Sequence, residues 1–403
     1  MQSQLLHTPE GVRDIYGTEG ARKHHLEQLL YERLHLGGYQ YIQTPGFEFF
    51  DVFRKERGTV PMQEMYRFFD REGNTLVLRP DFTPSIARCA AKYYREEKVP
   101  LRFCYQGNTY VNNSSYQGKL KETTQIGVEL LQDGSAYADA ELLALAVEVL
   151  CQAGLEDFQL EVGNAGFFAG IIAETSLSEE AVLELRTFIE DKYSYGVDSF
   201  LAEHTEEIPE GCQRLLHLLP ECFGSMEDLQ ALPALAEAER LSGAKQALLR
   251  LQEIERILSL YGCSGYITYD LGMLGKLNYY TGLIFRGYTY GTGEAIASGG
   301  RYDHLAGQFG KDIPAVGMAV NIDLLLLALA RQKMAPSPGE ERVLVLAAPA
   351  CEAEGIRRVQ ALRAAGIPAV LQIEEEKAAV FQDETACREF ARVERIVKGG
   401  GSE

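Results

Sequence analysis

The stretch LRFCYQGNTYVNN, residues 101–113, is the first place where the residue types raise the question of a ligand site. It reads as a β-strand that enters a polar loop and returns through a second strand at 122–131. Strands of this kind often lay a basic side chain on a nucleotide phosphate, yet after Arg102 this one offers only Gln106 and Asn108. Amides donate hydrogen bonds but lack the charge and the fork geometry of a guanidinium. The residue types therefore argue against nucleotide binding on this strand.

Metal chemistry has no support in the spacing of potential ligands. The eight cysteines are scattered and none forms a CxxC pair, so reduced, buried thiols are expected rather than a zinc site or a disulfide framework. Among the seven histidines, His24 and His25 occupy neighbouring and divergent helical positions, and no HExxH motif occurs. We therefore expect no metal and no cofactor.

The charge balance and the apolar runs restrict the partners. The formal net charge is −19, whereas proteins that hold a polyanion such as tRNA usually present a basic face. The start of the chain lacks the pattern of a signal peptide, and the apolar run at 324–330 is far shorter than the ~20 residues that span a bilayer. We expect a soluble, cytoplasmic protein that binds neither tRNA nor a membrane.

The elements around the 101–131 strand pair indicate one large domain and one small one. Helices and strands alternate through 1–330, and a wholly helical stretch at 178–262 resembles an insertion between strand-rich segments. A Pro-containing linker is expected at 331–341 and a small α/β domain at 342–403. The predicted fold class is α+β, with a mostly antiparallel sheet flanked by helices.

Four segments in order resemble the catalytic core of class II histidyl-tRNA synthetases. They are TPEGVRDI (8–15), LRPDFTPSIAR (78–88), QIGVEL (125–130) and SGGRYDHLAGQFGKDIPAVG (298–317). One such motif is weak support, but four in this order are strong. The resemblance covers residues 1 to about 330 and implies the class II aminoacyl-tRNA synthetase-like fold. It also implies that the C-terminal domain corresponds to a shortened anticodon-binding domain.

The departures from that family fall on its cationic positions. The synthetases grip ATP with an Arg and a Glu in the second class motif, where this chain has Gln106 and Asn108. The Arg of the histidine-specific segment corresponds to Gly275, with Lys276 beside it, and the final Arg of the third motif corresponds to Leu324. Preorganised cations stabilise the charge that develops during such a reaction, so their absence predicts that synthetase activity has been lost.

The amino-acid pocket of that family, by contrast, is matched. The resemblance implies histidine binding by two acidic residues that meet the α-ammonium or an imidazole N–H, a glutamine that orients the ligand, a threonine, and tyrosines that form aromatic walls. The matching positions are Asp81, Thr83, Gln125, Glu129, Tyr279, Tyr280 and Tyr302. Asp81 is one carbon shorter than the glutamate usual in the family.

Each of these residues also has a purely structural interpretation. Asp81 and Thr83 could cap a helix whose first position is Pro84, a residue favoured there. Gln125 and Glu129 lie two strand periods apart and so on one face, which suits a shared pocket or a solvated sheet face. Tyrosines are common in sheet packing. The arginines Arg79, Arg88 and Arg301 could form structural ion pairs rather than bind phosphate.

A synthetase-like core that keeps the amino-acid pocket and lacks the ATP-gripping arginines resembles the family of ATP phosphoribosyltransferase regulatory subunits. That resemblance implies a non-catalytic subunit in the first step of histidine biosynthesis. Its implied partner is the short-form catalytic subunit, with histidine as effector and a homodimer within a hetero-oligomer. The alternatives are an active histidyl-tRNA synthetase and a free-standing paralogue that handles an amino acid without tRNA.

Overall fold

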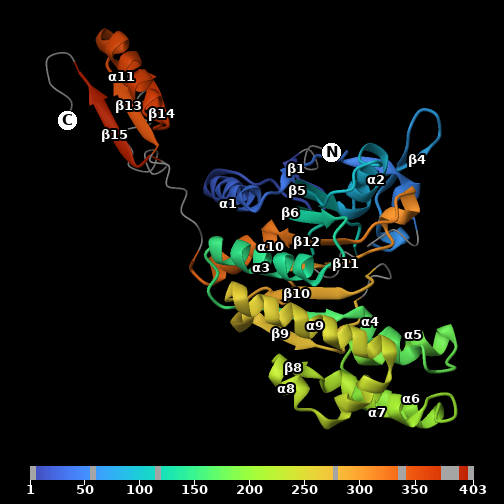
Figure 1. The fold of residues 1–403 in the computed structure, drawn as a ribbon. Coiled ribbons are helices and arrows are strands. Elements are labelled where there is room, and N and C mark those ends of the chain that lie inside the picture. Colours follow the sequence, from blue (N-terminus) through green and yellow to red (C-terminus); the bar gives the residue numbers. More distant parts are fainter. Residues whose placement is uncertain are drawn as a thin grey trace. The chain divides into compact units, whose positions relative to one another are not determined.

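The computed structural model describes residues 6–54, 60–113, 119–275, 280–334, 342–373 and 390–397, apart from the side chains of 233 and 234. The chain divides into two compact units, Met1–Pro336 and Ser337–Glu403 (Figure 1). Tyr279 and Lys276, both named above from the sequence, lie outside the described residues.

A nine-stranded sheet forms the centre of the first unit, with the strand order β1-β5-β6-β12-β11-β10-β7-β9-β8. Neighbouring strands run antiparallel except for the pairs β1/β5 and β7/β9. The predicted α+β class with a mostly antiparallel sheet is therefore confirmed. The strands are β1 (Gln40–Tyr41), β5 (Leu101–Tyr110), β6 (Glu122–Leu131), β7 (Phe158–Asn164), β8 (Phe223–Gly224), β9 (Ile267–Asp270), β10 (Leu283–Thr289), β11 (Ala297–Arg301) and β12 (Ala315–Asn321).

One face of this sheet is covered by a row of helices (Figure 1). They are α1 (Gly17–Leu36), α10 (Ile322–Arg331), α3 (Ala136–Gln152) and α9 (Ser242–Tyr261). Helix α1 contacts β5 and β6, α3 contacts β11 and β12, and α9 contacts β7. On β6 the alternate residues Ile126, Val128 and Leu130 join the buried core beneath this row. The intervening residues of β6 must then face the opposite side of the sheet.

That opposite side carries helix α2 (Thr83–Tyr93) and a second, smaller sheet of order β2-β4-β3. The strands are β2 (Phe47–Phe49), β4 (Thr75–Leu78) and β3 (Arg67–Phe69). Phe82, Ile86, Tyr105 and Tyr302 pack in a separate buried cluster between α2 and the large sheet. This cluster brings the segment after β4 against β5 and the end of β11.

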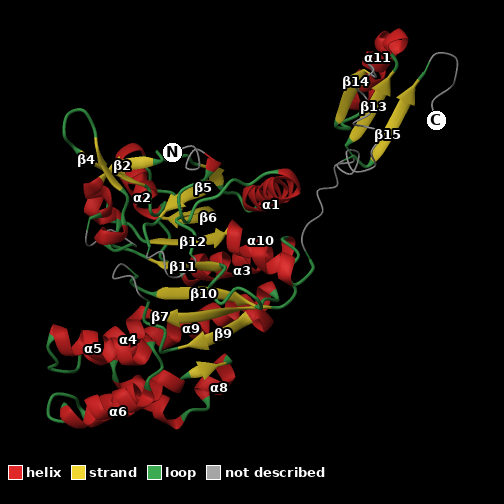
Figure 2. Ribbon diagram, turned by 180° about the vertical axis from the view of Figure 1, so that it is seen from behind, coloured by secondary structure: helices red, strands yellow, loops and turns green. Residues whose placement is uncertain are grey.

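The stretch between β7 and β9 is largely helical, as Figure 2 shows. It contains α4 (Ala165–Ile172), α5 (Glu179–Glu190), α6 (Ser194–Glu203), α7 (Glu210–Leu218), α8 (Met226–Gln230) and α9. Leu185 of α5 and Leu216 of α7 belong to the same buried cluster as Leu160 and Val162 of β7. These helices therefore extend the main core instead of enclosing one of their own.

The second unit is a small three-stranded sheet with one described helix. Strand β13 (Val343–Ala347) lies between β14 (Ala369–Ile373) and β15 (Arg392–Ile396), and both pairs are parallel. Helix α11 (Glu352–Ala364) connects β13 to β14, which makes a βαβ unit. Throughout the described part of the chain, no helix combines the length and apolar character needed to cross a membrane.

Candidate functional site

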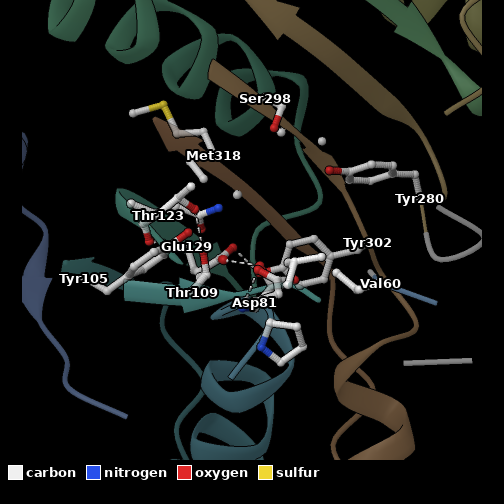
Figure 3. Close-up of a pocket in the computed structure, with 18 residues that line it drawn as sticks. Val60, Asp81, Tyr105, Thr109, Thr123, Glu129, Tyr280, Ser298, Tyr302 and Met318 are labelled. Carbon is white, nitrogen blue, oxygen red and sulfur yellow. Dashed lines mark hydrogen bonds between the residues drawn. The ribbon is translucent and has the colours of Figure 1, made fainter. Parts of the chain in front are cut away.

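A cavity of about 240 Å³ lies on the side of the large sheet that faces α2. Its walls come from β5, β6, β11 and β12 and from the segment Pro80–Thr83 that leads into α2. Figure 3 shows Glu129, Asp81 and Tyr302 close together, with Tyr280 and Ser298 lining another part of the wall. Six of the seven residues predicted from the sequence line this one cavity: Asp81, Thr83, Gln125, Glu129, Tyr280 and Tyr302.

Strand geometry explains why Gln125 and Glu129 share the cavity. Side chains alternate between the two faces of a strand, and Ile126 and Val128 already occupy the helix-covered face. Register then places Glu129 directly opposite Gly317 on β12. A Cβ atom at Gly317 would lie 1.7 Å from Oε2 of Glu129, so only glycine leaves room for that carboxyl group.

Glu129 is the buried centre of the site, with 1% of its surface exposed. Its Oε1 accepts a hydrogen bond from Oγ1 of Thr83 at 2.7 Å, and its Oε2 accepts one from the Tyr302 hydroxyl. Burial raises the pKa of Glu129 to about 8; the two hydrogen bonds oppose this rise, and the nearby Asp81 adds to it. The folded chain therefore holds the proton of this carboxyl group more tightly than an exposed glutamate would.

The start of α2 settles the alternative role of Thr83. The helix begins at Thr83, and the preceding Phe82 occupies the N-cap position without a capping hydrogen bond from its side chain. The expected capping role of Thr83 is therefore wrong, because its hydroxyl bonds to Glu129 instead. Asp81 does accept a hydrogen bond from the backbone N–H of Thr83, at 3.4 Å.

Gln125 and Tyr302 contribute polar groups to the wall of the cavity. Oε1 of Gln125 is buried and has no hydrogen-bond partner among the described residues, so an acceptor is available to a ligand. Tyr302 is 2% exposed and donates its hydroxyl to Glu129, so it is part of the wall and of the polar network.

The lining residues that were not identified from the sequence include Tyr105, Thr109, Thr123, Ser298 and Met318. Tyr105 stacks on Phe82 with ring centroids 4.3 Å apart, which forms one side of the cavity. Strand alternation from Gln125 would have indicated that Thr123 also faces the cavity. Which residues of β5 lie beside it depends on the register between the strands, which the sequence does not give.

The positions expected to replace the nucleotide-gripping pair lie on the other face of β5. Tyr105 and Thr109 line the cavity, whereas Gln106 bonds to Glu27 of α1. Asn108 donates to Glu122 at 2.6 Å and accepts from Thr124 at 3.0 Å. Alternation therefore turns Gln106 and Asn108 away from this cavity, and their correspondence to the nucleotide-gripping pair stays a prediction from the sequence.

The arginines of the matching motifs form structural contacts, as expected. Arg79 donates to the carbonyl oxygens of Thr44, Pro45 and Asn108 at 3.0–3.3 Å. Two others form ion pairs, Arg88 with Glu48 at 2.7 Å and Arg301 with Asp139 at 2.6 Å. No Lys, Arg or His is among the described residues that line the cavity.

Leu324 lies in a second cavity, which shares Val111 and Thr123 with the first. Leu324, Leu326 and Leu327 of α10 give it an apolar wall. Two cations at this cavity are paired: Arg13 with Glu19 at 2.6 Å, and Lys119 with Glu294 at 3.3 Å. Among the residues with described positions, no cluster of His, Cys, Asp and Glu is arranged to hold a metal ion.

Comparison with known proteins identifies the family. The model of the histidyl-tRNA synthetase family matches residues 11–325. The ATP phosphoribosyltransferase regulatory subunit of Acetivibrio thermocellus is 41% identical over 334 residues, which are 83% of this chain and 79% of the relative. The chain belongs to the family of ATP phosphoribosyltransferase regulatory subunits. The regulatory subunit of Clostridium kluyveri is 36% identical over 94% of this chain and 96% of its own length.

Solved structures agree with membership of the regulatory-subunit family. A Bacillus halodurans protein described as an ATP phosphoribosyltransferase regulatory subunit/histidyl-tRNA synthetase is 30% identical, with a TM-score of 0.85 over 98% of this chain and 99% of its own. Histidyl-tRNA synthetase from Nostoc is 20% identical, with a TM-score of 0.77 over 95% of this chain and 89% of its own. At that identity the synthetase shows the shared fold alone. A regulatory role in histidine biosynthesis fits the names of the relatives.

Proposed function

We propose that this chain senses histidine in the Glu129 cavity and controls a short-form catalytic subunit of ATP phosphoribosyltransferase, the first enzyme of histidine biosynthesis. The observation that carries the proposal is the convergence of Asp81, Gln125 and Glu129 on one cavity that Thr83 and Tyr302 brace. Two acids and an open amide acceptor suit a ligand with an ammonium group and an imidazole N–H.

Each lining residue then has a role in holding histidine. Glu129 and Asp81 would accept hydrogen bonds from the cationic end and from the imidazole, and Gln125 would accept a third. Tyr105, Tyr280 and Tyr302 would supply aromatic walls with polar edges. The family resemblance adds Tyr279 to this set as a proposal from the sequence.

The absence of synthetase activity is also part of the proposal. Activation of an amino acid with ATP needs preorganised cations around the transferred group. By the family resemblance Leu324 corresponds to one arginine of the synthetases. The described lining of the Glu129 cavity contains no cation. The net charge of −19, and nine Lys/Arg against ten Asp/Glu in residues 342–403, oppose tRNA binding.

Regulation would be a coupling between two sites on different subunits. Histidine bound here would change the activity of the catalytic subunit through the assembly, and the coupling in binding free energy would be reciprocal. We propose a homodimer of this chain within a hetero-oligomer. Residues 1–330 would hold the effector, and residues 342–403 would form a separate domain after the 331–341 linker.

The test is an assay of the short-form catalytic subunit from the same source, with and without this chain, while histidine is titrated into both. Stimulation together with histidine inhibition only in the mixture is expected. The Glu129→Gln variant should keep the stimulation and lose the inhibition. Unchanged activity and unchanged inhibition in the mixture would refute the proposal. Histidine-dependent ATP–pyrophosphate exchange by the chain alone would instead favour the synthetase alternative.

A further inference from the structure

The ionisable side chains described at the Glu129 cavity are two carboxyl groups and several tyrosines. Among the described residues that line it, Asp81 and Glu129 are the only ones with ionisable acidic or basic side chains besides tyrosines. The remaining polar groups, such as Thr109, Thr123 and Ser298, are neutral. An amino acid bound here would therefore meet acids at its ammonium end but no described cation at its carboxylate end.

The arginines nearest in sequence to the site residues are already occupied. Three backbone carbonyl groups accept hydrogen bonds from Arg79, and its guanidinium carbon lies 3.6 Å from the centre of the Phe82 ring. Arg301 is 5% exposed and is held by Asp139 and Asp303. Turning either arginine toward a ligand would leave buried polar groups unpaired, which is costly.

We propose that this pocket selects its ligand by the ammonium and the imidazole and forms no ion pair with the carboxylate, so that it accepts imidazole-bearing primary amines as a class. The inference rests on the proposed histidine site and narrows what that site recognises. Two acids favour a cation, whereas a carboxylate brought beside Asp81 meets repulsion, and the described lining residues offer it no cation. The carboxylate is therefore dispensable.

The surroundings of Glu129 support this selection. From every packed element the groups that face it are neutral or acidic: Thr83 of α2, Tyr105 of β5, Tyr302 after β11, bare Gly317 on β12, and Asp81. Burial among them raises the pKa of Glu129 to about 8. A bound ammonium would favour the ionised carboxylate, so binding near neutral pH should release a proton to the buffer.

Titration calorimetry of the full chain with histidine and three analogues tests the inference. Histamine and histidinol lack the carboxylate, and imidazolepropionate keeps it but lacks the amine. We expect histamine and histidinol to bind within about threefold of histidine or more tightly, because no ion pair is lost. Imidazolepropionate should bind at least ~30-fold more weakly, because its loss of the ammonium leaves the acids unpaired.

The outcomes separate this inference from the proposed function. If histidine binds and histamine binds more than about tenfold more weakly, the carboxylate is recognised and the inference is overturned while the histidine site stands. If none of the four compounds binds, the proposed histidine site itself is refuted. A Lys276→Ala variant that weakens histidine but not histamine would also overturn the inference, by revealing a carboxylate partner. Asp81→Asn should weaken the binding of histidine and histamine equally, because both carry the ammonium group; a loss confined to one of them would also contradict the inference.

Discussion

Arg301 and Asp139, which are 162 positions apart in the chain, form a buried ion pair beside the ligand cavity. Nε and Nη2 of Arg301 both donate to Oδ1 of Asp139, at 2.9 and 2.6 Å, and Arg250 donates to Oδ2 at 2.8 Å. Asp139 is fully buried. The pair fixes the end of β11 against α3, and the next residue, Tyr302, holds Glu129. An ion pair thus positions Tyr302 although neither of its members lines the cavity.

Asp139→Ala should destabilise the chain by about 3–5 kcal/mol, because it leaves two guanidinium groups without their buried partner. Chemical denaturation of the full chain measures the change. Glu253→Ala is the control, since it removes an ion pair with Arg256 on the exposed surface of α9 and should have little effect. If the two substitutions lowered the free energy of unfolding equally, the buried Arg301–Asp139 pair would contribute no more to stability than an exposed pair does.

Ionisation of Glu129 should lower the free energy of unfolding of the ligand-free chain as the pH rises. Its pKa is about 8 when folded against an ordinary value of 4.5, so between these values the folded state binds more protons than the unfolded state. The free energy of unfolding therefore falls through this window by up to about 1.4 kcal/mol per pH unit from this group. The penalty is absent below pH 4.5 and complete above pH 8.

Unfolding midpoints of the chain and of Glu129→Gln, compared between pH 5 and pH 8, isolate that contribution. As the pH rises, the unfolding midpoint of the variant should increase relative to that of the parent chain. Glu156→Gln, a substitution of an exposed residue between α3 and β7, should follow the parent at every pH. Parallel curves for all three proteins would mean that Glu129 ionises normally.

Thr83→Val should weaken histidine binding at pH 7 by about tenfold or more, since it removes a hydrogen bond to a carboxylate that the ligand needs in ionised form. Because that hydrogen bond lowers the pKa of Glu129, the substitution should also shift the pH midpoint of binding upward. Calorimetric titrations at several pH values measure both effects. Thr83→Ser keeps the hydroxyl and should bind almost normally; a loss as large as that of Thr83→Val would point to packing instead.

Gly317→Ala should abolish histidine binding, because the new methyl group occupies the space of the Glu129 carboxyl. Overpacking of this kind costs about 1–3 kcal/mol, so the variant should remain folded with a lower melting temperature. Gly265→Ala is the control, since a Cβ there meets nothing within 4 Å. Normal binding by Gly317→Ala would show that Glu129 can move aside without loss.

Strand alternation and turn residues were enough to predict the fold class, whereas the site residues were predicted from the family resemblance. Gln125 and Glu129 share a face because side chains repeat every two residues along any strand, a property that does not depend on tertiary contacts. Matching motifs brought Asp81, Thr83, Tyr280 and Tyr302 into the same prediction, and all four line the cavity with them.

The faces of β5 show where such reasoning ends. Alternation assigns Gln106 and Asn108 to one face, but which face meets the cavity depends on how β5 packs between α1 and α2. The sequence thus determined which residues can share a surface, because the backbone period is local. Only the tertiary structure decided that the Thr83 hydroxyl turns to Glu129, that Gly317 leaves room for that carboxyl group, and that burial raises its pKa. Each of these depends on atoms brought together from distant segments, and on the exclusion of water between them.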